Sequence, residues 1–419
     1  MSRSKLYLKP KKEESLLRFH PWIFSGAVAF VRGEPKEGDV VEVYSADHHF
    51  LGIGHYQIGS IAVRILSFTP VEIDVTFWTE RIRRAYFIRC SLGLVRRGGS
   101  HYPDGTAPDS GQGLSVSATM EANDTYRLVH GEGDGLPGLI IDVYAHTAVI
   151  QAHSVGMHYA RKDIVTALRE VLGEGVHRIY YKSEGTLPFK ADLHEENEYL
   201  YGADNKEPCT AIENGLRFHI DWLKGQKTGF FIDQRDNRSL LRQYAEGRDV
   251  LNMFCYTGGF SVYALRGGAS LVHSVDSSAK AIALTNENVG LNFPDDPRHQ
   301  AFAEDAFKFM ERIDNRYDLI VLDPPAFAKH KNVLHNALQG YRKLNAIAFK
   351  KIRPGGILFT FSCSQIVGKQ DFRLAVFSAA AQSGRTVRIL HQVAQPADHP
   401  INIYHPEGEY LKGLVLEVE

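Results

Sequence analysis

Residues 249–269 read DVLNMFCYTGGFSVYALRGGA, and this stretch decides the fold of the C-terminal half of the chain. An apolar run of strand length ends at Phe254, a turn contains Gly258 and Gly259, and an amphipathic helix follows. Glycines in such a turn let the backbone approach a ligand closely at the carboxyl end of a first strand, where α/β sheets bind cofactors. Taken alone they are weak evidence, since a tight strand-to-helix turn also needs glycine for steric reasons. The stretch predicts the first strand and turn of a Rossmann-like α/β domain.

Two acidic residues end the next two predicted strands. Asp276 ends LVHSVD, where its carboxylate is placed to accept hydrogen bonds from both ribose hydroxyls of an adenosine cofactor. Asp305 ends AFAED, and backbone groups beside it are placed to hold the adenine edge. A nicotinamide site favours G-x-G-x-x-G, whereas this turn reads T-G-G-F. The arrangement is similar to the cofactor site of class I S-adenosylmethionine (SAM) methyltransferases, and another small ligand on a Rossmann-like fold is the alternative.

Beyond residue 215, apolar strands alternate regularly with helices, which predicts a mostly parallel, doubly wound sheet. The predicted strands are DVLNMF (249–254), LVHSVD (271–276), AFAED (301–305), YDLIVLD (317–323), GGILFTFS (355–362), VRILHQV (387–393) and GLVLEV (413–418).

The fourth of these strands runs into DPPAF at residues 323–327. Pro324 and Pro325 fix an extended backbone that continues neither strand nor helix, and such a rigid edge suits the clamping of a flat base. Methyltransferases of nucleobases often place an acid or amide, two prolines and an aromatic residue here. Asp323 would then meet the polar edge of the base and Phe327 its face. A plain proline-rich turn is the alternative.

Cys363 follows the fifth strand, so it is expected at the same rim of the sheet as Asp323. Carbon 5 of a pyrimidine is a poor nucleophile, and its methylation ordinarily requires a thiolate that adds at carbon 6 and pushes electron density onto carbon 5. A cysteine at the rim supplies this thiolate, although a cysteine near a strand is most often a small buried hydrophobe. The cysteines with expected structural roles are Cys90, Cys209 and Cys255.

The segment LKGQKTGFFIDQRDNR, residues 223–238, lies just before the first strand. It mixes Phe230 and Phe231 with several charged groups, which are costly to bury unless they meet a ligand or one another. The alternative is a solvated helix face on which its arginines pair with its aspartates.

The first half of the chain predicts two smaller units. Residues 1–72 alternate short apolar runs with Gly and Pro, which is typical of a small all-β module. Helical spacing follows from Asp74 to Arg97, then a Gly-, Ser-, Pro- and Asp-rich loop insertion at 98–117, and an α+β pattern from Thr125 to Glu184. The arginines clustered in the predicted helix are Arg81, Arg83, Arg84, Arg89, Arg96 and Arg97.

The composition limits the function classes. The 419 residues suffice for two or three packed cores, and hydrophobic (44%) and charged (23%) fractions are those of a folded globular protein. The net charge of −1 means that an RNA partner must meet a local basic patch. The four cysteines have no paired spacing, which argues against a disulfide framework or a zinc site. With no run of 18 apolar residues, we expect a cytoplasmic protein without membrane or metal partners.

With these motifs in hand, the chain resembles the bacterial 23S ribosomal RNA large subunit (cytosine-5-)-methyltransferase I family, SAM-dependent enzymes with an N-terminal PUA domain. The stretches that carry the resemblance are RFHPWIFSGAV (18–28), GDVVEVYSADHHFLGIGHY (38–56), YRLVHGEGDGLPGLIID (126–142), GQKTGFFIDQRDNR (225–238), CYTGGFS (255–261), LDPPAF (322–327), SCS (362–364) and HPEGEYLKG (405–413). The resemblance extends over nearly the whole chain. The length of the insertion at 98–117 departs from the family, and related proteins of the same architecture modify other nucleotides.

The resemblance implies a PUA-like RNA-binding β-barrel (1–72), a connecting α+β unit (73–214) and a Rossmann-like SAM-dependent methyltransferase domain (215–419). The cofactor residues expected from it are Lys227, Thr228, Phe230, Asp233, Gln234, Arg235, Asn252, Phe254, Tyr256, Gly258, Asp276, Asp305 and Asp323. The expected catalytic residues are Cys363 and Asp323, and the expected substrate-binding residues are Pro324, Pro325 and Phe327.

The leading hypothesis is transfer of the SAM methyl group to carbon 5 of a cytosine in 23S rRNA, free or in the assembling large subunit. A homodimer is one of the oligomeric states left open. Methylation of an exocyclic amine is the alternative among enzymes, because DPPAF also suits an amino group and needs no thiolate. A catalytically silent RNA-binding or ribosome-assembly factor is the alternative outside enzymes. Cys363 is the residue that discriminates between the two enzymes.

Overall fold

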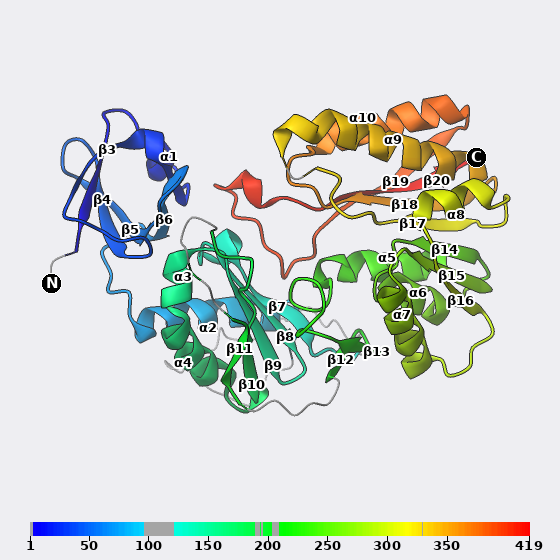
Figure 1. Ribbon diagram of the computed structural model, residues 1–419, viewed down its shortest axis with the longest axis horizontal. Coiled ribbons are helices and arrows are strands. Elements are labelled where there is room, and N and C mark those ends of the chain that lie inside the picture. The colour runs from blue at the N-terminus through cyan, green and yellow to red at the C-terminus, as the bar shows by residue number, and fades with distance from the viewer. Residues whose placement is uncertain (1–2, 96–120, 189–192, 194–195, 203–208, 329) are drawn as a thin grey trace, which may run out of the picture. The chain divides into compact units, whose positions relative to one another are not determined.

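A computed structural model describes residues 3–95, 121–188, 193, 196–202, 209–328 and 330–419 (Figure 1). The predicted insertion at 98–117 lies outside these residues, as do Arg96 and Arg97. The chain forms two compact units, one of Met1–Gly215, Ile220–Phe230 and Ala397–Gly408, the other of Leu216–His219, Phe231–Pro396 and Glu409–Glu419.

The first unit begins with a six-stranded mixed sheet in the order β2-β6-β5-β4-β1-β3. Its elements are β1 (Lys5–Leu8), α1 (Glu14–Leu17), β2 (Trp22–Phe24), η1 (Ser25–Ala27), β3 (Val28–Arg32), β4 (Val40–Tyr44), β5 (Phe50–Tyr56) and β6 (Ile61–Ser67). Alternation along β4 places Val41 and Val43 in the core and turns Glu42 to the opposite face. The expected all-β module is therefore present.

A second sheet of the first unit has five strands in the order β11-β10-β9-β8-β7. Its elements are α2 (Val75–Ser91), β7 (Thr125–His130), η2 (Gly131–Asp134), β8 (Leu139–Tyr144), β9 (Thr147–Ala152), α3 (Val155–Tyr159), α4 (Arg161–Leu172), η3 (Gly173–Gly175), β10 (Arg178–Tyr181) and β11 (Glu198–Tyr201). Helix α2 begins after Asp74, whose carboxylate accepts a hydrogen bond from the backbone N–H of Phe77 at 2.9 Å. Phe77 and Ile82 of α2 pack with Ile164 and Leu168 of α4 in one core, so the helices cover this sheet.

The arginines of α2 differ in exposure. Arg89 is fully buried, and its guanidinium donates two hydrogen bonds to the Asp134 carboxylate at 2.6 and 2.8 Å. It also donates to the backbone oxygen of Asp398 at 2.7 Å. Arg84, in contrast, is exposed. Arg89 thus stabilises the first unit, and of the arginines clustered in this helix it is one that is not exposed.

The second unit contains a seven-stranded sheet in the order β16-β15-β14-β17-β18-β20-β19. Its strands are β14 (Asp249–Met253), β15 (Leu271–Asp276), β16 (His299–Ala303), β17 (Leu319–Leu322), β18 (Gly356–Ser362), β19 (Val387–Ala394) and β20 (Lys412–Val418). The first five are parallel, and β20 is antiparallel to both β18 and β19. Every strand that the sequence predicts beyond residue 215 is present, and the α/β fold class is confirmed.

Helices cover both faces of the seven-stranded sheet. They are α5 (Arg235–Tyr244), α6 (Gly259–Arg266), α7 (Ala279–Asn292), α8 (Ala306–Arg312), α9 (Leu334–Lys351) and α10 (Lys369–Ser383), with the short turns η5 (Ile232–Gln234) and η6 (Lys331–Val333). Figure 1 shows α5, α6 and α7 on one face and α9 and α10 on the other, as in a doubly wound sheet. In the chain, a two-stranded hairpin of β12 (Cys209–Glu213) and β13 (Leu216–Ile220) precedes the seven-stranded sheet. Among the described residues, no helix is both long enough and apolar enough to span a membrane.

Candidate active site

The parallel strands of the second unit end along one edge of the sheet. The register pairs at this edge are Ala303 with Asp276, Val275 with Met253, Met253 with Leu322 and Leu322 with Thr360. Asp276, Phe254 and Asp323 therefore lie in one row across three neighbouring strands. The strand order reverses at β14, which has β15 on one side and β17 on the other. Ligands of open α/β sheets bind at such a switch point.

The turn after β14 has an unusual backbone. Phe254, Tyr256 and Gly258 have positive φ angles of 59°, 47° and 77°. A Cβ on Gly258 would lie 2.7 Å from Cγ2 of Thr285 in α7, so the glycine is needed for both its φ angle and this close packing. Two non-glycine residues with positive φ within one short turn are costly, and such residues cluster at ligand sites. The positive φ angles of Phe254 and Tyr256 therefore support a ligand site here more strongly than the glycines alone do.

Asp276 supports this turn. One oxygen of its carboxylate accepts a hydrogen bond from the backbone N–H of Tyr256 at 3.0 Å, and the other accepts one from Ser278 at 2.9 Å. Since an ionised carboxylate offers about four lone-pair sites, it retains capacity for ribose hydroxyl donors. Asp305 is exposed and caps α8 by accepting a hydrogen bond from the backbone N–H of Lys308 at 3.0 Å. A helix cap accounts for this second acid without a ligand.

Asn252 lies in β14, one strand position before the edge. Its amide nitrogen donates to the hydroxyl of Ser261 in α6 at 2.9 Å. Its side-chain oxygen is buried and has no hydrogen-bond partner among the residues that the structure describes. A buried acceptor of this kind is normally satisfied by water or a ligand, so Asn252 fits a site that receives a donor.

Residues 231–238 form η5 and the start of α5. Asp233, Gln234, Arg235 and Arg238 are all buried, with exposed fractions of 7% or less, so these four side chains do not form a solvated face. One ion pair of the alternative is present, since Arg235 lies 3.5 Å from the carboxylate of the exposed Asp236. Polar partners offset the cost of burying these side chains: Gln234 accepts a hydrogen bond from Asn237 at 2.6 Å, and Arg238 donates to the backbone oxygen of Phe231 at 2.9 Å.

Two contacts show how this segment is held. Asp233 accepts a hydrogen bond from the Tyr410 hydroxyl at 2.8 Å. The Phe231 ring lies edge-on to the Tyr256 ring with 5.0 Å between centroids. The segment therefore lies against the turn that follows β14.

Lys227, Thr228 and Phe230, which the sequence also assigns to the cofactor, belong to the first unit. The Thr228 hydroxyl donates to the Asp142 carboxylate at 2.6 Å and lies 2.9 Å from the Tyr144 hydroxyl. Phe230 is buried and Lys227 is exposed. The contacts of Thr228 give it a structural role within its own unit.

The structure brings Cys363 to the DPPAF motif. The Cys363 sulfur lies 4.0 Å from the backbone oxygen of Pro324, and the Ser364 hydroxyl donates to the backbone oxygen of Ala328 at 2.7 Å. The half-buried ring of Phe327 packs on Tyr341 with 4.7 Å between centroids. The thiol, Asp323 and the two prolines thus share one corner of the edge.

Sequence reasoning missed two residues at this corner. Tyr341 of α9 is fully buried, and its hydroxyl accepts a hydrogen bond from Ser362 at 2.9 Å. Lys412, the first residue of β20, is also buried and donates to the backbone oxygens of Ser364 and Val367, each at 2.6 Å. Lys412 lies within the HPEGEYLKG stretch that carried the resemblance, directly before the predicted strand GLVLEV. A lysine at that position was the signal by which sequence reasoning could have found it.

The other cysteines lack the features of a nucleophile. Burial raises the pKa of Cys255 to about 12 and that of Cys209 to about 11, so neither is a thiolate near neutral pH. Cys90 lies on α2 in the first unit. The structural roles expected of these three residues agree with their surroundings.

Comparisons with known proteins match both units. Residues 186–404 match the S-adenosylmethionine-dependent methyltransferase family, and residues 6–68 match the PUA-like domain family. Ribosomal RNA large subunit methyltransferase I of Aeromonas hydrophila subsp. hydrophila is 40% identical over 417 residues, 98% of each chain. The protein of the same name from Pseudoalteromonas atlantica is 40% identical over 420 residues, 99% of each chain.

Solved structures share the fold at lower sequence identity. A protein described as a SAM-dependent methyltransferase from Streptococcus mutans is 23% identical with a TM-score of 0.78, covering 99% of this chain and 100% of its own. A methyltransferase complexed with SAH is 24% identical with a TM-score of 0.80 over the same shares of the two chains.

Proposed function

Because the chain belongs to the S-adenosylmethionine-dependent methyltransferases, and among them to the ribosomal RNA large subunit methyltransferase I family, we propose that it methylates carbon 5 of a cytosine in 23S rRNA. SAM dependence and a ribosomal RNA substrate follow from the family. The choice of carbon 5 is supported by one observation: the Cys363 sulfur lies 4.0 Å from the backbone of Pro324, the residue after Asp323. A nucleophile and an acid thus share one corner of the sheet edge.

The residues at the edge fit SAM. Asp276 retains lone pairs for the ribose hydroxyls, and the buried Asn252 oxygen accepts a further donor. We propose that Phe254, Tyr256 and Gly258 supply the backbone of this site, with Asp233, Gln234 and Arg235 beside it. Asp305 and Asp323 complete the part of the proposed cofactor set that lies in the second unit, and Lys227, Thr228 and Phe230 of the first unit stay predictions from the resemblance. SAM supplies an electrophilic methyl group.

Cys363 would begin the chemistry as a thiolate. Its sulfur forms a bond to carbon 6 of the cytosine, and the electron pair of the carbon 5–carbon 6 double bond shifts into the ring, where Asp323 hydrogen-bonds or protonates nitrogen 3. Carbon 5 then takes the methyl group from the sulfonium sulfur. Loss of the proton on carbon 5 to a base restores the double bond and expels the Cys363 thiolate. The cysteine is thereby regenerated.

Pro324, Pro325 and Phe327 would position the base. The two prolines fix the extended backbone that carries Asp323, and the hydrogen bond from Ser364 to Ala328 fastens the end of this segment to the strand that carries Cys363. Because the acid and the thiol are held on joined segments, they are presented to one base together.

Lys412 would favour the thiolate form of Cys363. Its ammonium has three N–H donors, and two of them are used on the backbone oxygens of Ser364 and Val367. Burial lowers the pKa of Lys412 to about 8, and the negative charge of a Cys363 thiolate opposes this shift. Lys412 is therefore mostly protonated at pH 7, and a cation beside a cysteine stabilises its thiolate.

The N-terminal PUA-like module, residues 1–72, would dock the RNA together with the arginine-bearing helix of the connecting unit, residues 73–214. PUA-like sequence at residues 6–68 supports this division of labour, as does the exposed Arg84 on α2. Attraction between such basic residues and phosphates makes binding sensitive to salt.

The test is a comparison of Cys363→Ala with Cys255→Ala on large-subunit rRNA. We expect Cys363→Ala to lose turnover and keep its SAM affinity, because the thiolate activates the base and does not hold the cofactor. RNA carrying 5-fluorocytidine at the target should form a covalent adduct with the wild type, since fluorine blocks the final elimination. A denaturing gel would show the shifted band.

Two outcomes would contradict the proposed function and favour one of its alternatives. Normal methylation by Cys363→Ala, with no adduct, would favour methylation of an exocyclic amine at the DPPAF edge. An unaltered pattern of modified nucleosides in rRNA from a deletion strain, read by mass spectrometry, would favour a silent assembly factor.

A further inference from the structure

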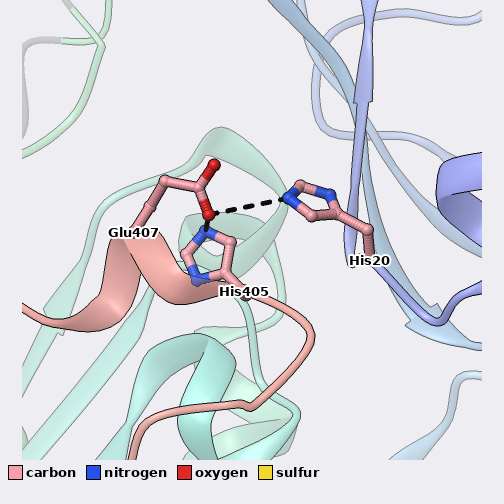
Figure 2. Close-up of side chains that lie close together, drawn as sticks. All are labelled: His20, His405 and Glu407. Carbon is pink, nitrogen blue, oxygen red and sulfur yellow. Dashed lines mark ion pairs between the residues drawn. The ribbon is translucent and has the colours of Figure 1, made fainter.

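Three side chains gather within the first unit, whereas the proposed nucleophile Cys363 belongs to the second (Figure 2). His20 precedes β2, and His405 and Glu407 lie at η7 (Pro406–Gly408). One ligand atom from each lies within 4.8 Å of the others. Nε2 of both histidines points at the same Glu407 oxygen, and each lies 3.7 Å from it.

His405 is the member that needs an explanation. His405 is 2% exposed, and neither nitrogen of its ring has a hydrogen-bond partner among the residues described. Buried imidazole nitrogens without partners are costly, because burial removes their hydrogen bonds to water. A ligand between the three side chains would satisfy the Nε2 atom that faces Glu407.

The spacing suits a metal ion that prefers nitrogen ligands. Zinc bonds of about 2.0–2.1 Å in tetrahedral geometry place ligand atoms roughly 3.4 Å apart. The two 3.7 Å separations to Glu407 are close to this value, so small side-chain rotations would complete the set. Two imidazoles and one carboxylate suit Zn²⁺, Ni²⁺ or Co²⁺, whereas Mg²⁺ prefers oxygen ligands.

The surroundings of His20 also fit a metal ligand. Its Nδ1 atom lies 3.2 Å from the backbone oxygen of Trp22. The backbone N–H of Trp22 lies at the same distance of 3.2 Å from Nδ1. In the tautomer that donates from Nδ1 to the Trp22 oxygen, Nε2 has a free lone pair toward Glu407, and this outer hydrogen bond is usual for histidines that bind metals.

We propose that His20, His405 and Glu407 bind a divalent transition-metal ion, with Zn²⁺ as the reference ion, and that the ion fastens residues 405–407 to the N-terminal sheet. The expectation of no metal site rested on the spacing of the cysteines, which says nothing of histidines. Ligands almost 400 positions apart would close a very long loop, so the ion would stabilise the first unit.

Calorimetric titration of the full chain, freed of metal by a chelator, tests the site directly. We expect one equivalent of Zn²⁺ to bind, Ni²⁺ and Co²⁺ to compete for the site, and Mg²⁺ not to compete. His405→Ala and Glu407→Gln should each lower the Zn²⁺ affinity by at least about 100-fold. Loss of an outer-shell partner typically costs about 10- to 100-fold, and loss of a direct ligand should cost no less than the upper end of that range. Zn²⁺ should raise the melting temperature of the wild type by several degrees, and of neither variant.

Two controls make the result specific. His177→Ala removes one of two exposed histidines stacked at 4.3 Å and should leave the Zn²⁺ affinity unchanged. The Trp22 ring lies 4.3 Å from that of His405, so Zn²⁺ should change the tryptophan emission of the wild type and not that of Trp22→Phe.

The site is overturned if Zn²⁺ does not bind, or if Glu407→Gln binds it as tightly as the wild type. Glu407→Gln serves even if His405→Ala folds poorly, because the Glu407 side chain is 49% exposed. Equal competition by Mg²⁺ would overturn the assignment to an ion that prefers nitrogen.

Discussion

The Lys412 ammonium donates a 2.6 Å hydrogen bond to the backbone oxygen of Ser364, the residue after Cys363. Lys412 also stands opposite Ser362 in the antiparallel pair of β18 and β20. The last strand of the sheet therefore delivers a buried cation to the segment that carries the proposed nucleophile.

Replacement of Lys412 by Met should make Cys363 less reactive. Without the neighbouring cation, we expect the pH of half-maximal alkylation by iodoacetamide to rise by about one unit, and methylation at pH 7 to fall about tenfold. Alkylation should be followed at Cys363 by mass spectrometry. Lys412→Arg, which keeps the charge, should restore part of the rate. An unchanged alkylation profile in Lys412→Met would reduce Lys412 to a packing residue.

Lys412 should also contribute to the pH dependence of the free energy of unfolding. Its pKa is about 8 in the folded chain, below the ordinary lysine value of 10.5, because burial disfavours the charge. Between these two pH values the unfolded chain binds more protons, so the contribution of Lys412 to the free energy of unfolding rises with pH. Denaturant unfolding from pH 7 to 10.5 should show this rise in the wild type. A Lys412→Met protein with the same slope would contradict the shift.

Asp276→Ala should weaken SAM binding by about 2 kcal/mol, since the ribose hydroxyls lose their acceptor and the backbone N–H of Tyr256 loses its partner. Calorimetry with SAM measures the loss. Asp314→Ala, which removes an exposed acid near the end of α8, is the matched control and should bind normally. Wild-type affinity in Asp276→Ala would remove the ribose assignment.

Gly258→Ala should lower both stability and SAM affinity, because the new Cβ meets Thr285 and the positive φ is strained. Thr285→Ser removes the methyl group that the new Cβ would meet. It keeps the hydroxyl that donates to the Tyr256 backbone oxygen at 2.9 Å. The double variant should therefore recover part of the loss. Gly290→Ala, in open space on α7, should be neutral or stabilising by about 0.5–1 kcal/mol. Absence of any rescue would mean that the φ angle alone sets the cost.

The arginines of α2 should separate into two classes. Arg89→Ala leaves Asp134 buried and unpaired, so we expect a loss of about 3–5 kcal/mol in stability. Arg84→Ala should change stability by less than about 0.5 kcal/mol, weaken RNA binding and lower its salt dependence by about one counterion. Denaturant unfolding and RNA titrations at several salt concentrations measure both. Equal RNA affinity in Arg84→Ala and the wild type would exclude α2 from the RNA surface.

The periodic parts of the fold could be predicted from sequence. The strands β14, β15, β17 and β18 are largely apolar runs, and the order of strands and helices then leaves few topologies. The rows of acids at strand ends follow from the same pattern, which is why Asp276 and Asp323 could be placed on one edge.

Long-range partners could not be predicted in this way. Arg89 reads as one of several helical arginines, and only the fold shows that it is buried against Asp134. Lys412 reads as the polar start of a strand, and its place beside Ser364 depends on the insertion of β20 between β18 and β19. His20 and His405 lie in separate motifs, so no local spacing signals their approach.

The position of β20 also bears on how the chain is made. Because β20 lies between β18 and β19, the seven-stranded sheet has a gap until residues 412–418 have left the ribosome. The first unit likewise takes in Ala397–Gly408, so neither unit is complete when its N-terminal elements emerge. Domains generally fold as units during synthesis, the N-terminal one first. This chain instead completes both units only after residues 397–418 have been synthesised, and until then the edges of β18 and β19 lack the strand that pairs with both.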